Sequence, residues 1–184
     1  MTVLQEVNYF ISGGNKYYNF DEFKNNKDGK LFVIGLSGSG KSTLGQEAAR
    51  KTKASYIKLD SIDRGYRSAY AKRLKKDIWS KEVNSLTKEK MNEFFNHLLT
   101  LKGKYVVEGI HILYHDFDFF KDKPVIILET SVLLSSIRAY NRNFKQYHDK
   151  GATRLQILND LYRNQEEFID KLKKFENFME GKNE

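Results

Sequence analysis

The segment GLSGSGKS, at residues 35–42, matches the phosphate-binding pattern G-x-x-x-x-G-K-[ST] at every specified position. Glycines let backbone N–H groups converge on phosphate oxygens, and the N-terminus of a following helix adds a positive dipole. Lys41 can reach the β- and γ-phosphates of a nucleotide, and the Ser42 hydroxyl can bind Mg²⁺. The predicted nucleotide-binding residues are Gly35, Ser37, Gly38, Ser39, Gly40, Lys41, Ser42 and Thr43.

Two carboxylates follow, about twenty residues further along the chain. Asp60 comes directly after an apolar segment at residues 55–59. An acid at the carboxyl end of a strand beside the phosphate loop faces the ligand crevice of an α/β sheet, where it can accept the proton of an attacking hydroxyl. Two alternatives stay open: Asp60 only caps the next helix, or Asp63 is the base. Arg64 and Arg67 could hold an acceptor or form a solvated helix face.

A third acid, Glu108, ends the segment at residues 104–108 and precedes Gly109. At that strand end a carboxylate can direct Mg²⁺, often through water. The alternative is a strand-end glutamate paired with a lysine. His111 and His115 are four residues apart, but no third ligand is evident, so we do not expect a metal between them.

The elements that must position these groups follow from the apolar pattern. Four short apolar segments, at residues 31–35, 55–59, 104–108 and 124–128, predict strands that are buried on both faces. Helical patterns occur at residues 41–51, 85–101 and 131–147. The second of these is predicted to bury Leu86, Phe94, Leu98 and Leu101. Strands that alternate with helices indicate a parallel sheet with helices on both faces, an α/β fold of three layers.

The two ends of the chain differ from this core. Residues 1–30 are predicted to be an N-terminal extension with a hairpin formed by residues 7–11 and 16–20. Residues 31–184 are predicted to be the main domain, and its C-terminal helix runs from about residue 154 to 180.

Composition narrows the function classes. A chain of 184 residues supports one α/β domain, and the absence of cysteine excludes disulfides and thiolate metal sites. The net charge of +8 favours anionic partners but does not separate nucleotides from nucleic acid. No apolar run approaches the ~18 residues of a membrane span, and the first residues lack a secretion-signal pattern. We therefore expect a cytoplasmic protein without a membrane partner.

Further motifs resemble a known family. Together with the phosphate loop, Leu-Asp-Ser at residues 59–61, Val-Val-Glu-Gly-Ile-His at 106–111 and Leu-Glu-Thr at 128–130 are similar to small P-loop kinases of the uridine kinase and phosphoribulokinase type. More broadly, they resemble the nucleoside- and nucleotide-kinase superfamily, over about residues 30–147. The chain departs from uridine kinases after Ser61 and lacks their Arg-Gly-Arg lid signature, so the acceptor is left open.

The resemblance implies a three-layer P-loop NTPase fold with a helical lid, and ATP and Mg²⁺ as nucleotide and metal. It implies Asp60 as general base, Lys41 and Ser42 as the phosphate and Mg²⁺ groups, and Glu108 near the acceptor or the metal. The lid would span about residues 131–150 and bring Arg138 and Arg142 over the transferring phosphoryl group. These arginines share one helix face because they are four residues apart; the alternative is a solvated basic helix.

The function predicted from the sequence is ATP-dependent phosphoryl transfer to a hydroxyl or phosphate of a small acceptor, such as a nucleoside, a nucleotide or a related metabolite. A polynucleotide 5′-end kinase is one alternative, because the basic run at residues 72–76 suits a nucleic-acid backbone. A nucleotide-binding regulatory ATPase is the other. Guanine-nucleotide specificity is not expected, since Asn26-Lys27-Asp28 precedes the phosphate loop and has the wrong spacing.

Overall fold

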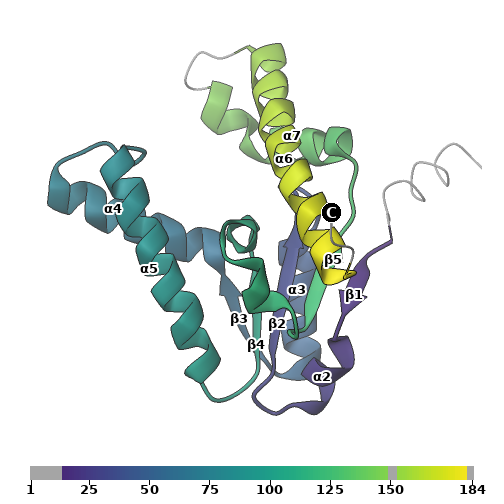
Figure 1. The fold of residues 1–184 in the computed structure, drawn as a ribbon. Helices are drawn as coiled ribbons and strands as arrows, with labels where there is room; N and C mark the ends of the chain where they lie inside the picture. Colours follow the sequence, from purple (N-terminus) through teal and green to yellow (C-terminus); the bar gives the residue numbers. More distant parts are fainter. Residues whose placement is uncertain (1–13, 149–152, 182–184) are drawn as a thin grey trace, which may run out of the picture.

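A computed structural model describes residues 14–148 and 153–181 of the chain. Its centre is a five-stranded sheet with the strand order β1-β5-β2-β4-β3 (Figure 1). The strands are β1 (Lys16–Tyr18), β2 (Lys30–Gly35), β3 (Ser55–Lys58), β4 (Tyr105–Glu108) and β5 (Val125–Leu128). The last four are parallel to one another, whereas β1 pairs with β5 in antiparallel register. The predicted parallel α/β sheet is therefore confirmed.

Helices cover both faces of this sheet (Figure 1). The α-helices are α2 (Phe20–Asn25), α3 (Lys41–Thr52), α4 (Leu59–Leu74), α5 (Lys81–Thr100), α6 (Val132–His148) and α7 (Arg154–Met179). Two 3₁₀ helices, η1 (Ile110–Tyr114) and η2 (Phe117–Phe120), lead from β4 to β5. None of the helices in residues 14–148 and 153–181 is long and apolar enough to span a membrane.

Successive residues of the central strands point to opposite faces, so each strand contributes to two cores. On one face, Phe32 and Ile34 of β2 pack in a cluster that includes Phe95 of α5, Phe120 of η2 and Phe175 of α7. On the other face, the alternate β2 residues Leu31 and Val33 join a smaller cluster with residues of α2 and α3. Both faces of β2 are therefore buried, so the strand that carries the phosphate loop has a well-defined position.

Local sequence signals explain where several helices begin. Ser80 caps α5, because its side chain accepts a hydrogen bond from the backbone N–H of Val83. Helix α7 begins with a capping box in which Thr153 and Gln156 each bond the other's backbone N–H. Figure 1 shows that the pairs α4–α5 and α6–α7 diverge from the sheet as two separate arms.

One prediction about burial is wrong and another is confirmed only in part. Strand β3 was expected to be covered on both faces, but it lies at the edge of the sheet, and Ser55 and Lys58 are exposed. In the predicted stripe of α5, Leu98 is fully buried, and Phe94 and Leu101 are half-buried against the core. The fully buried stripe passes through the neighbouring residues instead and consists of Val83, Thr87, Met91, Phe95 and Leu98.

The N-terminal hairpin cannot be compared as a whole, because its first half at residues 7–11 lies outside the described residues. Its second half contains β1, and β1 extends the main sheet by pairing Tyr17 with Ile126 of β5. Lys16 also contacts Glu176 and Glu180 near the end of α7. Residues 16–18 are thus a structural part of the main sheet.

Candidate active site

The phosphate loop connects β2 to α3 and turns tightly at two glycines. Gly38 and Gly40 have backbone φ angles of +84° and +98°, in the region that favours glycine. A Cβ atom on Gly38 would lie 2.5 Å from the backbone oxygen of Ser135 in α6. The glycine therefore allows both the turn of the loop and the close approach of α6.

Lys41, the first residue of α3, folds back onto this loop. Its Nζ donates a hydrogen bond to the backbone oxygen of Leu36 at 2.8 Å, and the residue is buried. Burial lowers the pKa of Lys41, and the nearby carboxylates of Glu108 and Asp60 oppose that shift. An ammonium group so poorly hydrated interacts strongly with any anion that enters the loop.

The next residue, Ser42, meets Glu108 at the end of β4. The Ser42 hydroxyl donates to Glu108 Oε1 at 2.9 Å, and the Tyr56 hydroxyl donates to the same oxygen, also at 2.9 Å. Glu108 is almost completely buried, with 1% exposed. Burial and the contact with Glu108 raise the pKa of Tyr56 to about 12, so Tyr56 remains a neutral donor at ordinary pH.

A hydroxyl and a carboxylate side by side fit the hard oxygen chemistry that Mg²⁺ prefers. Ser42 and Glu108 are therefore the residues that could hold Mg²⁺ here. The described side chains contain no group of three or more His, Cys, Asp or Glu residues that could hold a metal ion. A metal here would depend on nucleotide phosphates and water for its other ligands, as Mg²⁺ in phosphoryl-transfer sites commonly does.

Asp60 lies in the first turn of α4, immediately after β3. Its side chain is 47% exposed, and His111 of η1 lies beside it, with Nε2 3.3 Å from Asp60 Oδ1. The His111 contact lowers the pKa of Asp60; burial opposes this shift, and Lys41 and Lys58 add to it. Asp60 is thus an ionised carboxylate at the edge of the cleft that contains the loop.

Asp63, the alternative base, has a different environment. It is buried at 7% exposure, and its Oδ2 accepts a hydrogen bond from Nε of Arg67 at 2.6 Å. Arg67 also contacts Asn84 of α5, and its guanidinium lies 4.8 Å from the centre of the exposed Trp79 ring. Asp63 and Arg67 therefore link α4 to α5, one turn away from Asp60.

Helix α6 places both predicted lid arginines against the phosphate loop. Nη2 of Arg142 donates to the Ser37 hydroxyl at 2.9 Å, and Nη1 of Arg138 donates to the Gly38 backbone oxygen at 3.4 Å. Both side chains are exposed. The arginines therefore reach the loop while remaining accessible from the cleft.

One loop contact has no counterpart in the sequence-based prediction. Gln165 of α7 is 2% exposed and binds both backbone groups of Ser37. Its Nε2 donates to the Ser37 oxygen at 2.7 Å, and its Oε1 accepts from the Ser37 N–H at 3.2 Å. The one available sequence signal was a polar residue on the apolar face of a helix, and that signal names no partner.

These groups surround one cleft of about 790 Å³. Most of the predicted site residues line it: Ser37, Gly38, Ser39, Gly40, Lys41, Ser42, Thr43, Asp60, Glu108, Arg138 and Arg142. Gly35 lies at the end of β2 and does not line the cleft. Asp63 does not line it either, whereas the unpredicted Lys58 and Phe168 do.

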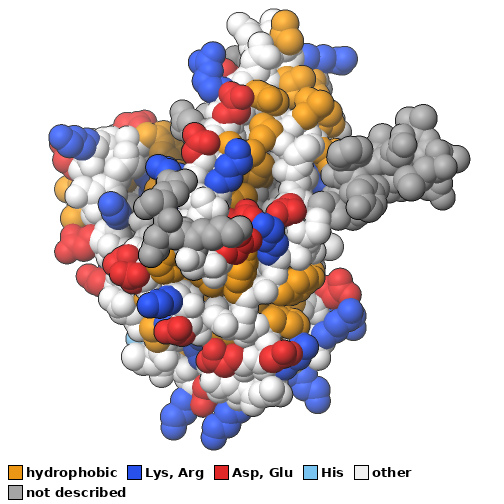
Figure 2. All heavy atoms as spheres, turned by 45° about the vertical axis from the view of Figure 1, so that its right-hand side comes forward, with side chains coloured by type: hydrophobic (Ala, Val, Ile, Leu, Met, Phe, Trp, Pro, Cys, Tyr) orange, Lys and Arg blue, Asp and Glu red, His pale blue; other side chains and the backbone are white. Residues whose placement is uncertain are grey.

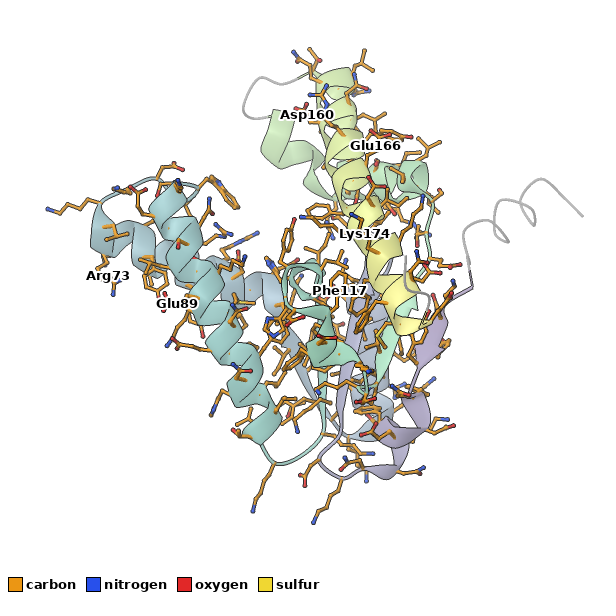
Figure 3. All side chains as sticks on the ribbon, viewed as in Figure 1. Arg73, Glu89, Phe117, Asp160, Glu166 and Lys174 are labelled. Atoms are coloured by element: carbon orange, nitrogen blue, oxygen red, sulfur yellow. The ribbon has the colours of Figure 1, made fainter. Side chains whose placement is uncertain are left out.

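The remaining candidates lie elsewhere. His115 contacts Asn92 of α5, with 2.8 Å between Nδ1 and Oδ1, and its ring stacks on Phe95. His115 therefore packs against α5, whereas His111 contacts Asp60. Tyr66 packs against the larger core, whereas Trp79 is 67% exposed. Arg73, in the basic run at residues 72–76, projects from the α4–α5 arm and lies over the Tyr70 ring (Figure 3).

Known proteins resemble this fold. A family model described as an AAA domain matches residues 31–110. Among solved structures, a shikimate kinase from Bacteroides thetaiotaomicron aligns with a TM-score of 0.52 and 17% identity, covering 83% of this chain and 82% of that one. A shikimate kinase from Acinetobacter baumannii, in complex with shikimate, aligns with a TM-score of 0.50 and 19% identity, covering 83% of each chain. No curated protein matches the sequence. The predicted P-loop NTPase fold is confirmed by these similarities.

Proposed function

We propose that this chain, which has the fold of the P-loop small-molecule kinases, transfers the γ-phosphoryl group of ATP to a hydroxyl or phosphate of a small acceptor. One observation carries the proposal. A single cleft brings the phosphate loop together with a partly exposed carboxylate, Asp60, and with Ser42 bonded to the buried Glu108. Binding a nucleotide needs only the loop; phosphoryl transfer also needs groups that orient an acceptor and a metal.

In this proposal each group has a distinct task. The loop backbone and Lys41 hold the β- and γ-phosphates, and Asp60 orients the acceptor oxygen and takes its proton. Ser42 and Glu108 hold Mg²⁺, which neutralises charge on the phosphates when it is bound. Arg138 and Arg142 contact the transferring group from α6, the predicted lid. We also propose residues 31–184 as the kinase domain, with β1 and α2 from residues 1–30 completing its sheet and one of its cores.

The distribution of charged side chains on the surface favours one class of acceptor. On the face shown in Figure 2, Lys and Arg side chains are interspersed with Asp and Glu and do not form one continuous basic tract. Within the run at residues 72–76, Lys76 is paired with Glu82 of α5. These features favour a small acceptor over a nucleic-acid backbone, which is bound by clustered positive charge. A nucleoside, a nucleotide or a related metabolite is the proposed class.

The test is phosphoryl transfer from γ-labelled ATP to a panel of nucleosides, nucleotides, sugars, shikimate and single-stranded oligonucleotides. Shikimate is included because both structural relatives described above are shikimate kinases. Label should move to one small-molecule class in the wild type and not in Lys41→Ala. Transfer to oligonucleotides alone would favour the polynucleotide kinase, and ATP hydrolysis without any acceptor would favour the regulatory ATPase.

A further inference from the structure

The imidazole of His111 lies between two carboxylates near the start of α4, Asp60 and Asp63. Its Nε2 is 3.3 Å from Asp60 Oδ1, and its Nδ1 is 3.8 Å from Asp63 Oδ1. The three side chains come from two elements, since His111 belongs to η1 and both aspartates to α4. Such an arrangement allows the ring to be held from one side while it acts on the other.

The Asp63 side of this arrangement is the fixed side. Asp63 is buried and bonded to Arg67, which in turn contacts Asn84 of α5. Only 22% of the His111 side chain is exposed. A largely buried ring beside a fixed carboxylate loses little further freedom when it binds a second group, so it can fix that group effectively.

The backbone is also shaped for this contact. A Cβ atom on Gly109 would lie 2.8 Å from Cβ of Leu59, the residue before Asp60. The absence of a side chain at Gly109 therefore lets the end of β4 pass close to the start of α4. His111, two residues later, reaches Asp60 because of this close approach.

Asp60 itself presents two unlike oxygens. Oδ1 is buried and makes no hydrogen bond within the described residues, and Nε2 of His111 lies 3.3 Å from it, although 47% of the Asp60 side chain is exposed. The carboxylate therefore meets the cleft through its other oxygen, Oδ2. The orientation of Oδ2 depends on what holds Oδ1.

We propose that His111 is a positioning residue that holds Asp60 through Oδ1, so that Oδ2 faces the acceptor hydroxyl. This inference rests on the proposed phosphoryl transfer. In that step the acceptor oxygen bonds to the γ-phosphorus, the bond to the β–γ bridging oxygen breaks, ADP leaves, and the hydroxyl proton passes to Asp60 Oδ2. His111 gains and loses no proton in the step, and Asp63, itself bonded to Arg67, lies on the other side of the ring.

The charges around Asp60 give the inference a measurable signature. His111 lowers the pKa of Asp60, and Lys41 of α3 and Lys58 of β3 lower it further. Asp63 and Tyr56 are the other titratable neighbours on the elements packed there. Without His111 the pKa of Asp60 should rise, because a favourable contact with its charged form is lost.

The experiment combines a carboxylate NMR titration of Asp60 with steady-state kinetics, using MgATP and the acceptor identified by the panel. In His111→Ala, Asp60 should titrate at higher pH, and the acid limb of kcat should move in the same direction. At its optimum pH, kcat should fall by about 10²-fold, the cost of a misplaced reacting group, with the KM for ATP nearly unchanged. His111→Gln, which retains a side-chain N–H donor, should recover most of kcat.

His115→Gln is the matched control, because His115 lies on the same segment but packs on Asn92 and Phe95. It should lower stability without changing the titration of Asp60 or kcat. An active wild type whose Asp60 titration or kcat is unaffected by His111→Ala would overturn this inference alone. A wild type that transfers the phosphoryl group to no acceptor, whether or not it hydrolyses ATP, would overturn the proposed function and this inference together.

Discussion

The phosphate loop and the acceptor side of the cleft are built in different ways. The loop follows a fully buried central strand, and its polar groups bond to one another or to α6 and α7. Asp60 follows the edge strand β3, and its Oδ1 lies 3.3 Å from Nε2 of a single side chain of η1, His111. All nucleotides carry phosphates, so a loop with a fixed shape can bind any of them. In the proposed function the acceptor is bound by groups such as Asp60, which have few neighbours and can therefore change without disturbing the fold.

The largest expected effect lies on the acceptor side. Asp60→Asn keeps the shape of the side chain but removes the proton-accepting charge, so kcat should fall by about 10²–10⁴-fold while ATP binding is retained. Kinetics and ATP calorimetry on the same protein would separate the two quantities. Asp63→Asn is the informative partner, since it should lower stability by weakening the contact with Arg67. A larger loss of kcat in Asp63→Asn than in Asp60→Asn would move the base to Asp63.

The corresponding change in the loop is Lys41→Ala. Removing a buried charge aimed at the phosphates should lower kcat by about 10²–10³-fold and leave the fold intact. Turnover and far-UV circular dichroism would measure both. Lys51→Ala is a control on the same helix, because Lys51 is exposed and paired with Glu47. Equal activity in the two variants would contradict the assignment of the loop.

Variants of the two α6 arginines test whether this helix acts on the phosphates that the loop holds. Arg138→Ala and Arg142→Ala should each lower kcat about tenfold, or ~1.4 kcal/mol, and weaken ATP binding less, because their charge acts on the transferring group. Lysine should substitute poorly, since it lacks a planar fork of donors. Arg163→Ala on α7 is an exposed control. An unchanged kcat in the double variant would make α6 a solvated basic helix.

Gln165 is expected to matter for the shape of the loop. Gln165→Ala leaves the backbone N–H and C=O of Ser37 without their side-chain partner, which should cost about 1–3 kcal/mol of stability. The KM for ATP should rise severalfold, and kcat should change less. Chemical denaturation and ATP titration would measure these effects. Glu166→Ala, the exposed neighbour that projects from α7 in Figure 3, should leave both quantities unchanged.

The smallest effect concerns Tyr56, whose pKa is raised to about 12. A raised pKa stabilises the folded state at pH values below the ordinary tyrosine pKa of about 10, and this contribution disappears as the pH rises toward the folded value. The stability of the wild type should therefore fall more steeply between about pH 10 and about pH 12, the interval between the ordinary and the raised pKa, than that of Tyr56→Phe. Denaturant unfolding at several pH values would show the difference. Tyr17→Phe, at an exposed position, should follow the wild type.

The difference between the two regions also explains what the sequence could predict. The loop was predictable because its eight residues are contiguous and lie between a buried strand and a helix, so local spacing determines the geometry. The parallel sheet was predictable for a similar reason. Gln165 and Ser37 are 128 residues apart, and no local pattern indicates that they meet.

Asp60 and His111 show the same limit on the acceptor side. Each motif was recognised, but their contact depends on how η1 passes the start of α4, a tertiary arrangement. The buried stripe of α5 was predicted only in part for a related reason: Phe94 and Phe95 are equally apolar, and only the packing of Phe95 on Phe32 and Phe120 decides between them. The antiparallel placement of β1 was missed because its partner lies more than a hundred residues away in the sequence.

The strand β1 has a further consequence for the behaviour of the protein in concentrated solution. It occupies the outer side of β5, whose sequence VIIL is wholly apolar and buried. A strand of this kind with unpaired backbone groups is a template on which another chain can add, the first step of edge-to-edge aggregation. Three residues of β1, anchored to α7 through Lys16, therefore occupy the edge of β5 and prevent another chain from adding to it.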